Sequence, residues 1–218
     1  MGKVEVHGLL ASPPTRAVVI TCEILGIPYE LKQLDPMNKS PEFKKLTAQQ
    51  QIPVLVDDGF ALPESRAIMQ YLADKYGKDD SLYPKDLKAR AVVNARLNFD
   101  NGTLWPRLIQ AYRPTFSGGQ VDEEGLKSLL DSMGVIEEFL TREKWVAGPK
   151  MTLADISFSG IICILTVPEV KFDMTPFPKV KAWIEECRKN PILKKYDDLG
   201  VQQTRERMAM LREKFKQR

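Results

Sequence analysis

A polar, turn-rich segment, residues 77–84 (GKDDSLYP), divides the chain into two parts with different sequence patterns. Before this segment, short apolar runs with strand character alternate with helix-like stretches. Beyond it, strand patterns almost disappear and apolar residues recur at helical spacing. We therefore expect an α/β domain at residues 1–78, a linker at residues 79–86 and an all-α domain at residues 87–218.

The first part predicts a small α/β sandwich with the element order β-α-β-α-β-β-α. Ser12 and the two prolines after it suit the start of a helix, and Gly26 with Pro28 suits its end. A turn at residues 57–59 (DDG) separates two apolar runs and predicts a hairpin. Strands are expected at residues 3–7, 29–34, 54–56 and 60–62, with helices after Ser12, after Ser40 and over residues 64–76.

The second part predicts helices throughout. Pro106 lies inside the first of them and should kink or break it, because proline removes one hydrogen bond of the helical ladder. Thr152 and Asp155 resemble a capping box, with Asp in the position where Glu is usual. The expected helices cover residues 89–112, 121–140, 152–167, 177–187 and 201–216, with a loop at residues 116–119.

Composition argues against several classes of function. The 32 basic and 29 acidic residues give a net charge of +3, so neither nucleic acid nor an acidic membrane is expected as the main partner. The three cysteines are widely spaced and suggest neither a disulfide framework nor a metal site. We find no signal peptide and no apolar run of about 20 residues. A soluble, cytoplasmic protein without a metal is expected.

The stretch from Gln49 to Ile68 combines the hairpin with the start of a helix. Glu64 and Ser65 open that helix, so a carboxylate, a hydroxyl and unpaired helix N–H groups come together. Such a corner suits a small zwitterion. Acidic and hydroxyl residues are also ordinary caps at a helix start, so the pattern alone leaves both interpretations open.

Five short motifs lie in order along the chain. They are Ser12-Pro13-Pro14-x-Arg16, Ile52-Pro53, ESRAI at residues 64–68, FDxGTL at residues 99–104 and TLAD at residues 152–155. Together they resemble the cytosolic glutathione transferases and are most similar to the arthropod delta and epsilon classes. The resemblance spans nearly the whole chain. It implies a thioredoxin-like domain followed by an all-helical domain, a homodimer, and attack of the glutathione sulfur on hydrophobic electrophiles in the detoxification of xenobiotics.

Ser12 matches the serine that members of these classes use as the catalytic hydroxyl. Lowering the pKa of the glutathione thiol from about 8.5 to 7 corresponds to about 2 kcal/mol. A hydrogen bond to a charged group supplies about 1.5–3 kcal/mol and a helix N-terminus about 0.3–1 kcal/mol, so one hydroxyl is sufficient. The alternative is that Ser12 only caps its helix.

The resemblance also implies which residues bind glutathione, the co-substrate. The Ile52-Pro53 bond would be cis and the Ile52 backbone would pair with the cysteinyl unit; a trans proline that starts a strand is the alternative. Glu64 would accept from the γ-glutamyl ammonium and Ser65 would donate to its carboxylate, while Asp100 would approach the same amine from a partner subunit. The full expected set is Gln50, Ile52, Pro53, Glu64, Ser65 and Arg66.

Gln50 departs from the family pattern, because relatives carry a histidine there that contacts the glycyl carboxylate. The only histidine in the chain is His7, on the first expected strand. The loop at residues 35–39 also looks shorter than in relatives. A neutral hydrogen bond contributes about 0.5–1.5 kcal/mol, less than a charged one, so we expect weaker glutathione binding than in typical members.

The electrophile is expected to bind between the two domains, on the first loop and on the helix that Pro106 interrupts. The alternative is that these residues belong to the core. A binding protein that sequesters hydrophobic ligands in the same cleft is the second functional hypothesis, and a partner-binding adaptor is the third. The candidate pocket residues are Leu10, Ala11, Pro14, Trp105, Leu108, Ile109, Tyr112 and Phe116.

Overall fold

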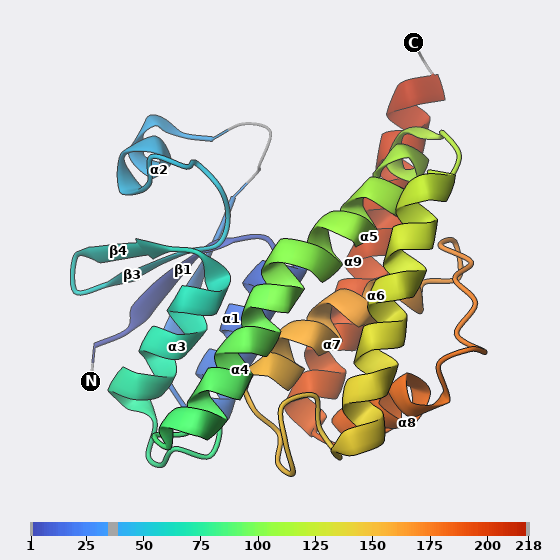
Figure 1. Ribbon diagram of the computed structural model, residues 1–218. Coiled ribbons are helices and arrows are strands. Elements are labelled where there is room, and N and C mark those ends of the chain that lie inside the picture. Colours follow the sequence, from blue (N-terminus) through green and yellow to red (C-terminus); the bar gives the residue numbers. More distant parts are fainter. Residues whose placement is uncertain (1, 35–38, 217–218) are drawn as a thin grey trace.

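A sheet-bearing part and a helical part lie side by side in the computed structural model, which describes residues 2–34 and 39–216 (Figure 1). The sheet-bearing part follows the predicted element order. The predicted shortening of the loop at residues 35–39 falls almost entirely outside the described residues. The elements are β1 (Val4–Gly8), α1 (Pro13–Leu25), β2 (Tyr29–Gln33), α2 (Pro41–Leu46), β3 (Val54–Asp57), β4 (Phe60–Pro63) and α3 (Ser65–Tyr76).

The sheet is mixed, with the strand order β2-β1-β3-β4. β1 pairs in parallel with β2 and antiparallel with β3, and β3 forms the predicted hairpin with β4. Val4 and Val6 point to the buried side of β1, because side chains alternate along a strand. α1 and α3 pack against each other, and both contact α7 of the helical part. The starts of α1 and α3 thereby reach the boundary between the two parts.

The second part is helical, as the sequence predicts. α7 lies at its centre, and all of its residues are buried. Within the described residues, no helix combines the length and the apolarity needed to cross a membrane. The elements are α4 (Leu87–Phe99), a π-helical turn η1 (Asp100–Leu104), α5 (Trp105–Tyr112), a 3₁₀ turn η2 (Arg113–Ser117), α6 (Glu123–Arg142), α7 (Leu153–Leu165), α8 (Pro178–Cys187) and α9 (Pro191–Lys216).

The helix that contains Pro106 is interrupted, as predicted. α4 ends at Phe99, and the wide turn η1 separates it from α5. In this turn the Trp105 N–H donates to the carbonyl of Asp100, five residues back. Because Pro106 has no N–H to donate, the ladder is already incomplete at this point and the wider turn is accommodated there.

α9 begins at Pro191 and not at Val201, where the sequence pattern suggested. The start is capped, because Asn190 Oδ1 accepts hydrogen bonds from the N–H groups at residues 192 and 193. Gly200 lies inside the helix, where the Arg16 side chain leaves no room for a Cβ. Glycine is a poor helix former, so its presence weakened the helical pattern that the sequence offered.

The predicted capping box at the start of α7 is confirmed. The Thr152 hydroxyl caps the helix, and Asp155 Oδ2 accepts from the Thr152 N–H at 2.8 Å. Asp155 is fully buried, and its Oδ1 accepts from the Val146 N–H and from Trp183 Nε1, each at 3.0 Å. One carboxylate therefore joins α7 to the loop before it and to α8.

Candidate functional site

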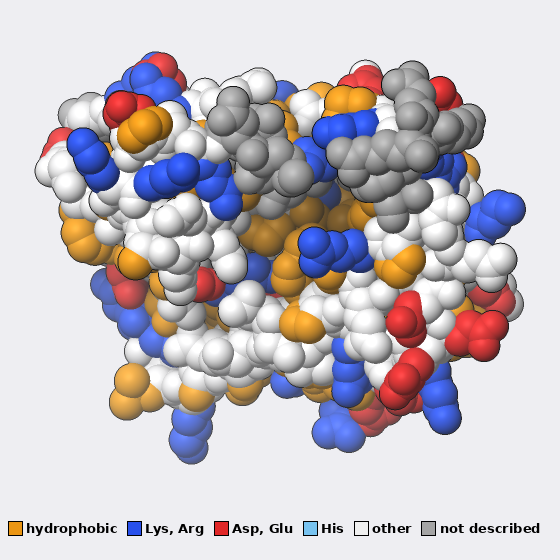
Figure 2. All heavy atoms as spheres, turned by 90° about the horizontal axis from the view of Figure 1, so that it is seen from above, with side chains coloured by type: hydrophobic (Ala, Val, Ile, Leu, Met, Phe, Trp, Pro, Cys, Tyr) orange, Lys and Arg blue, Asp and Glu red, His pale blue; other side chains and the backbone are white. Residues whose placement is uncertain are grey.

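A cavity of about 530 Å³ lies where the two parts of the molecule meet. Seen from above, the surface is hollowed between them, with hydrophobic side chains on the floor and basic side chains around the rim (Figure 2). The wall consists of Ser12, Pro14, Lys39, Gln49, Gln51, Ile52, Pro53, Pro63, Glu64, Ser65, Arg66, Asn101, Trp105 and Arg113.

Ser12 occupies the N-cap position of α1, but its hydroxyl forms no capping hydrogen bond to any described residue. Pro13 and Pro14 fill the first two helical positions, so two of the four N–H groups that a helix start leaves without an intrahelical partner do not exist. The side chain is half-buried and lines the cavity. Its hydroxyl is consequently available to a group bound there.

The Ile52-Pro53 peptide bond is cis, in agreement with the sequence-based expectation. Both residues line the cavity, and Pro53 is buried directly before β3. The backbone N–H and C=O of Ile52 have no hydrogen-bond partner in the part of the chain that the structure describes. A bound peptide would find one free donor and one free acceptor at this position.

Glu64 is the N-cap of α3 and adopts φ = +70°, a conformation that is unusual for a residue with a side chain. Its side chain makes no capping bond among the described residues, is exposed and lines the cavity. Such a backbone conformation costs on the order of 1–3 kcal/mol and is often found at ligand sites. The next residue, Ser65, is buried at the first position of the helix.

Arg66 and Asp100 form a buried ion pair that links α3 to η1. Arg66 Nε and one terminal nitrogen donate to Asp100 Oδ2 at 2.9 and 2.7 Å, and Ser157 of α7 donates to the same oxygen. Another Arg66 nitrogen donates to the Ser65 hydroxyl at 2.9 Å. Burial raises the pKa of the Asp100 carboxyl, and the Arg66 guanidinium and the Ser157 hydroxyl oppose that rise.

The expectation that Asp100 reaches the γ-glutamyl amine of a partner subunit is wrong. Its side chain is fully buried and is bonded to residues of its own chain. Burying a carboxylate requires a compensating charge, and Arg66 supplies it within the same chain. The motif around Asp100 indicated an important carboxylate but not the direction in which it points.

Most of the expected glutathione residues lie on the wall of the cavity, and Gln50 does not. Gln50 is exposed, with φ = +51°, and its neighbours Gln49 and Gln51 line the cavity instead. His7 is also absent from the wall as the structure describes it; its Nε2 lies 3.0 Å from Glu5 Oε2 on β1. Among the described residues, no group of three or more His, Cys, Asp or Glu side chains is arranged to hold a metal.

Only two of the expected electrophile residues, Pro14 and Trp105, line the cavity. Leu108 and Tyr112 are buried and belong to the core, as the alternative interpretation held. The side chains of the other four are partly buried and lie outside the wall; these are Leu10, Ala11, Ile109 and Phe116.

Lys39, Asn101 and Arg113 line the cavity but were not predicted from the sequence. Lys39 precedes α2, and Arg113 begins the turn after α5. Neither belongs to a recognisable motif, and a single basic residue in a polar loop is normally solvated. Their position becomes evident only when the two parts of the chain are packed together.

Two family models match the chain. The model for the glutathione S-transferase N-terminal domain matches residues 6–80, and the model for the C-terminal domain of the same enzymes matches residues 104–191.

Insect proteins are similar to the chain over most of its length. Glutathione S-transferase D7 of Anopheles gambiae is 39% identical over 181 residues, which cover 81% of this chain and 82% of that protein. Glutathione S-transferase 1 of Manduca sexta is 38% identical over 200 residues, covering 89% and 92%. Among solved structures, a delta-class glutathione transferase of Nilaparvata lugens has a TM-score of 0.89 at 38% identity, covering 95% of this chain and 99% of that one. An epsilon-class glutathione S-transferase of the housefly, Musca domestica, has a TM-score of 0.86 at 35% identity, covering 97% and 98%.

Proposed function

The chain belongs to the glutathione S-transferase family, and on that basis we propose that it conjugates the sulfur of glutathione to hydrophobic electrophiles with Ser12 as the catalytic residue. The observation that carries this proposal is the free hydroxyl of Ser12, which faces the cavity and makes no capping bond to a described residue. The detoxification of xenobiotics is the role that fits such a reaction.

The sulfur of glutathione is placed against Ser12 in this proposal. A hydroxyl that donates to a thiolate favours the charged form by about 1.5–3 kcal/mol, and the start of α1 adds about 0.3–1 kcal/mol. Lowering the pKa of the thiol to about 7 needs about 2 kcal/mol. Because Pro13 and Pro14 leave few helix N–H groups at this end, most of the stabilisation falls on the Ser12 hydroxyl.

The γ-glutamyl end is placed at the start of α3. The exposed carboxylate of Glu64 would accept from the ammonium group, and Ser65 with the helix N-terminus would bind the carboxylate. The free backbone groups of Ile52 would pair with the cysteinyl unit. Arg66 donates a hydrogen bond to the Ser65 hydroxyl and so positions this side chain.

The glycyl carboxylate is placed at the outer wall, against Lys39 and the amides of Gln49 and Gln51. The histidine of the family pattern is missing, and Lys39 offers a positive charge in its place. Lys39 forms no ion pair with another described residue, so its charge is available to a ligand.

Conjugation of glutathione to a chlorinated nitroaromatic, followed by absorbance, tests the proposal. We expect turnover above the uncatalysed rate, and a loss of at least tenfold in kcat/KM for Ser12→Ala. Ser81→Ala removes an exposed hydroxyl that does not line the cavity and should leave kcat/KM unchanged. If Ser12→Ala is as active as the wild type, then Ser12 does not stabilise the sulfur.

A protein that binds glutathione and hydrophobic ligands without turning them over is the alternative. The specific observation in its favour is the absence of an imidazole from the described wall of the cavity. Saturable binding of glutathione by calorimetry, together with a conjugation rate equal to the uncatalysed rate, would establish it. We also propose that the chain acts as a homodimer, which sedimentation velocity measures directly.

A further inference from the structure

Arg113 is the cation of the described cavity wall that the proposed glutathione pose leaves unused. Arg66 is already bonded to Asp100 and Ser65, and Lys39 faces the glycyl end of the pose. Arg113 is exposed, and its side chain forms no ion pair or hydrogen bond with any residue that the structure describes. A free guanidinium on the wall of a ligand cavity is a ready partner for a planar anion.

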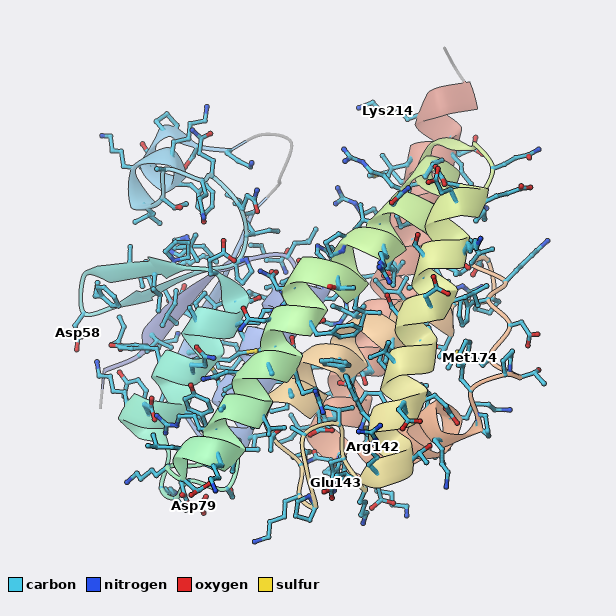
Figure 3. All side chains as sticks on the ribbon, in the orientation of Figure 1. Asp58, Asp79, Arg142, Glu143, Met174 and Lys214 are labelled. Atoms are coloured by element: carbon cyan, nitrogen blue, oxygen red, sulfur yellow. The ribbon has the colours of Figure 1, made fainter. Side chains whose placement is uncertain are left out.

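The backbone that carries Arg113 is firmly anchored. Tyr112 before it is buried, and Thr115 Oγ1 donates to the Tyr112 carbonyl at 2.7 Å. Arg212 of α9 donates to the Thr115 carbonyl at 3.4 Å. The end of α9, marked by Lys214 in Figure 3, accordingly packs beside the turn η2. The position of Arg113 is therefore fixed while its side chain stays free to meet a ligand.

Arg113 shares its wall with the expected electrophile site and not with the glutathione site. Trp105 and Arg113 lie at opposite ends of α5, on the helical side of the cavity. Glu64, the acidic residue of the described wall, lies on the sheet-bearing side at the start of α3. A flat electrophile that contacts the Trp105 ring would thus meet a positive charge at the far end of the same wall, where the described lining includes no carboxylate.

We propose that Arg113 makes this enzyme prefer hydrophobic electrophiles that carry a carboxylate away from the reacting carbon. The inference rests on the proposed conjugation. In that step the glutathione sulfur forms a C–S bond, the chloride of an aryl chloride leaves with the bonding electron pair, and the thiol proton passes to solvent. Arg113 contacts neither the sulfur nor the leaving group; it binds the carboxylate.

Two electrophiles of similar size and shape but different charge test the inference. 4-Chloro-3-nitrobenzoate and 4-chloro-3-nitrobenzamide have the same leaving group and the same activating nitro group, and the carboxylate or amide lies opposite the chloride. Each kcat/KM is divided by the uncatalysed rate constant with glutathione, which removes the difference in intrinsic reactivity. We expect the wild type to favour the benzoate about tenfold, since a partly desolvated arginine–carboxylate contact contributes about 1.4 kcal/mol.

Substitutions at Arg113 should change the preference for the benzoate according to the charge of the new side chain. Arg113→Met should bring the ratio close to one, Arg113→Lys should retain most of it, and Arg113→Glu should favour the benzamide. Added KCl should reduce the wild-type preference, because salt shortens the range of the electrostatic attraction. If a variant still turns over the benzamide, then that variant is folded.

Matched controls separate a local contact from net charge. Arg205→Met removes a positive charge from an exposed arginine of α9 that pairs with Glu169, and it should keep the benzoate preference. A wild-type ratio near one, or a ratio unchanged in Arg113→Met, would overturn the inference while benzamide turnover still supported the proposed function. If Arg113→Met raises the KM for glutathione and retains the benzoate preference, then Arg113 binds glutathione, and the inference is overturned. No turnover of either compound would overturn both.

Discussion

Lys39 carries the charge at the glycyl end of the proposed glutathione pose. An ammonium against a partly exposed carboxylate contributes about 1 kcal/mol, close to a fivefold change in affinity. We expect Lys39→Met to raise the KM for glutathione about fivefold with kcat nearly unchanged, because an interaction made equally in the ground and transition states is lost. Initial rates at varied glutathione concentration measure both constants.

Lys44→Met is the matched control, since Lys44 is an exposed lysine of the nearby helix α2. It should leave the KM for glutathione unchanged. Equal KM values for Lys39→Met and the wild type would show that Lys39 does not contact glutathione. Gln50→His, which the sequence alone predicts to lower this KM, should have a smaller effect than Lys39→Met because Gln50 lies off the wall.

Asp197 is a buried carboxylate whose ionisation opposes folding. Its side chain is 4% exposed, and burial raises its pKa to about 6, against the opposing effect of Arg16 and Arg188. Between the unfolded value of about 3.9 and the folded value, the native state binds more protons, so stability falls as pH rises. We expect a loss of about 2 kcal/mol in the free energy of unfolding between pH 4 and 7 from this group.

Asp197→Asn should remove that pH dependence, which urea unfolding at pH 4, 5, 6 and 7 measures. Asp198 next to it provides a control of opposite sign, because its hydrogen bond with Lys194 lowers its pKa. The native state therefore releases the Asp198 proton more readily, and Asp198→Asn should remove stability that is gained as pH rises to about 4 or 5, at the acidic end of the series. A wild-type profile that Asp197→Asn leaves unchanged would contradict the account of Asp197.

The site residues that could be predicted from the sequence are those whose roles are set by their near neighbours. Ser12 precedes two prolines, and Glu64 with Ser65 opens a helix, so each lies at a helix start that a pattern can mark. Lys39 and Arg113 carry no such local signal. Their roles depend on how two distant segments pack, which no local pattern encodes.

The start of α7 is a helix cap that also links neighbouring elements. Thr152→Ala removes one capping hydroxyl and should lower the free energy of unfolding by about 1 kcal/mol. Asp155→Ala should cost about 3 kcal/mol or more, because it leaves the buried N–H groups of Val146, Thr152 and Trp183 without a partner. Urea unfolding measures both values.

The comparison of the two losses of unfolding free energy decides whether Asp155 acts mainly as a helix cap or mainly as a link between elements. If Thr152→Ala costs as much as Asp155→Ala, then helix capping dominates and the links to the preceding loop and to α8 contribute little. Thr141→Ala removes a hydroxyl from the exposed side of α6 and should change the free energy of unfolding by less than about 0.5 kcal/mol.

Elements were predictable wherever local signals agreed. The hairpin over residues 54–63 and the capping box at Thr152 combine turn or cap residues with a clear apolar pattern, and both formed as expected. The start of α9 was missed because Gly200 lies inside the helix to make room for Arg16. That contact joins α9 to α1 across the chain, and a local pattern contains no information about it.

Across the whole molecule, Asp100 joins three elements that meet beside the cavity. Arg66 comes from α3 of the sheet-bearing part, Ser157 comes from α7, and Asp100 itself begins η1. Arg66 also holds the Ser65 hydroxyl, which the proposed pose assigns to the γ-glutamyl carboxylate. The packing of the two parts and the geometry of the glutathione site therefore depend on the same buried carboxylate.

Asp100→Asn tests this dependence, because it preserves the volume of the side chain and removes its charge. Arg66 would then be a buried cation without a counter-charge, and we expect the free energy of unfolding to fall by about 3–5 kcal/mol. Ser157→Ala removes a single hydrogen bond to the carboxylate and should cost less, about 1.5–3 kcal/mol, so this variant should remain folded for kinetic work. Ser157 does not line the cavity. If Ser157→Ala raises the KM for glutathione, the effect must therefore be indirect, through Asp100 and Arg66 on the position of Ser65. Loss of stability without any change in that KM would show that the ion pair holds the two parts together but does not position the site.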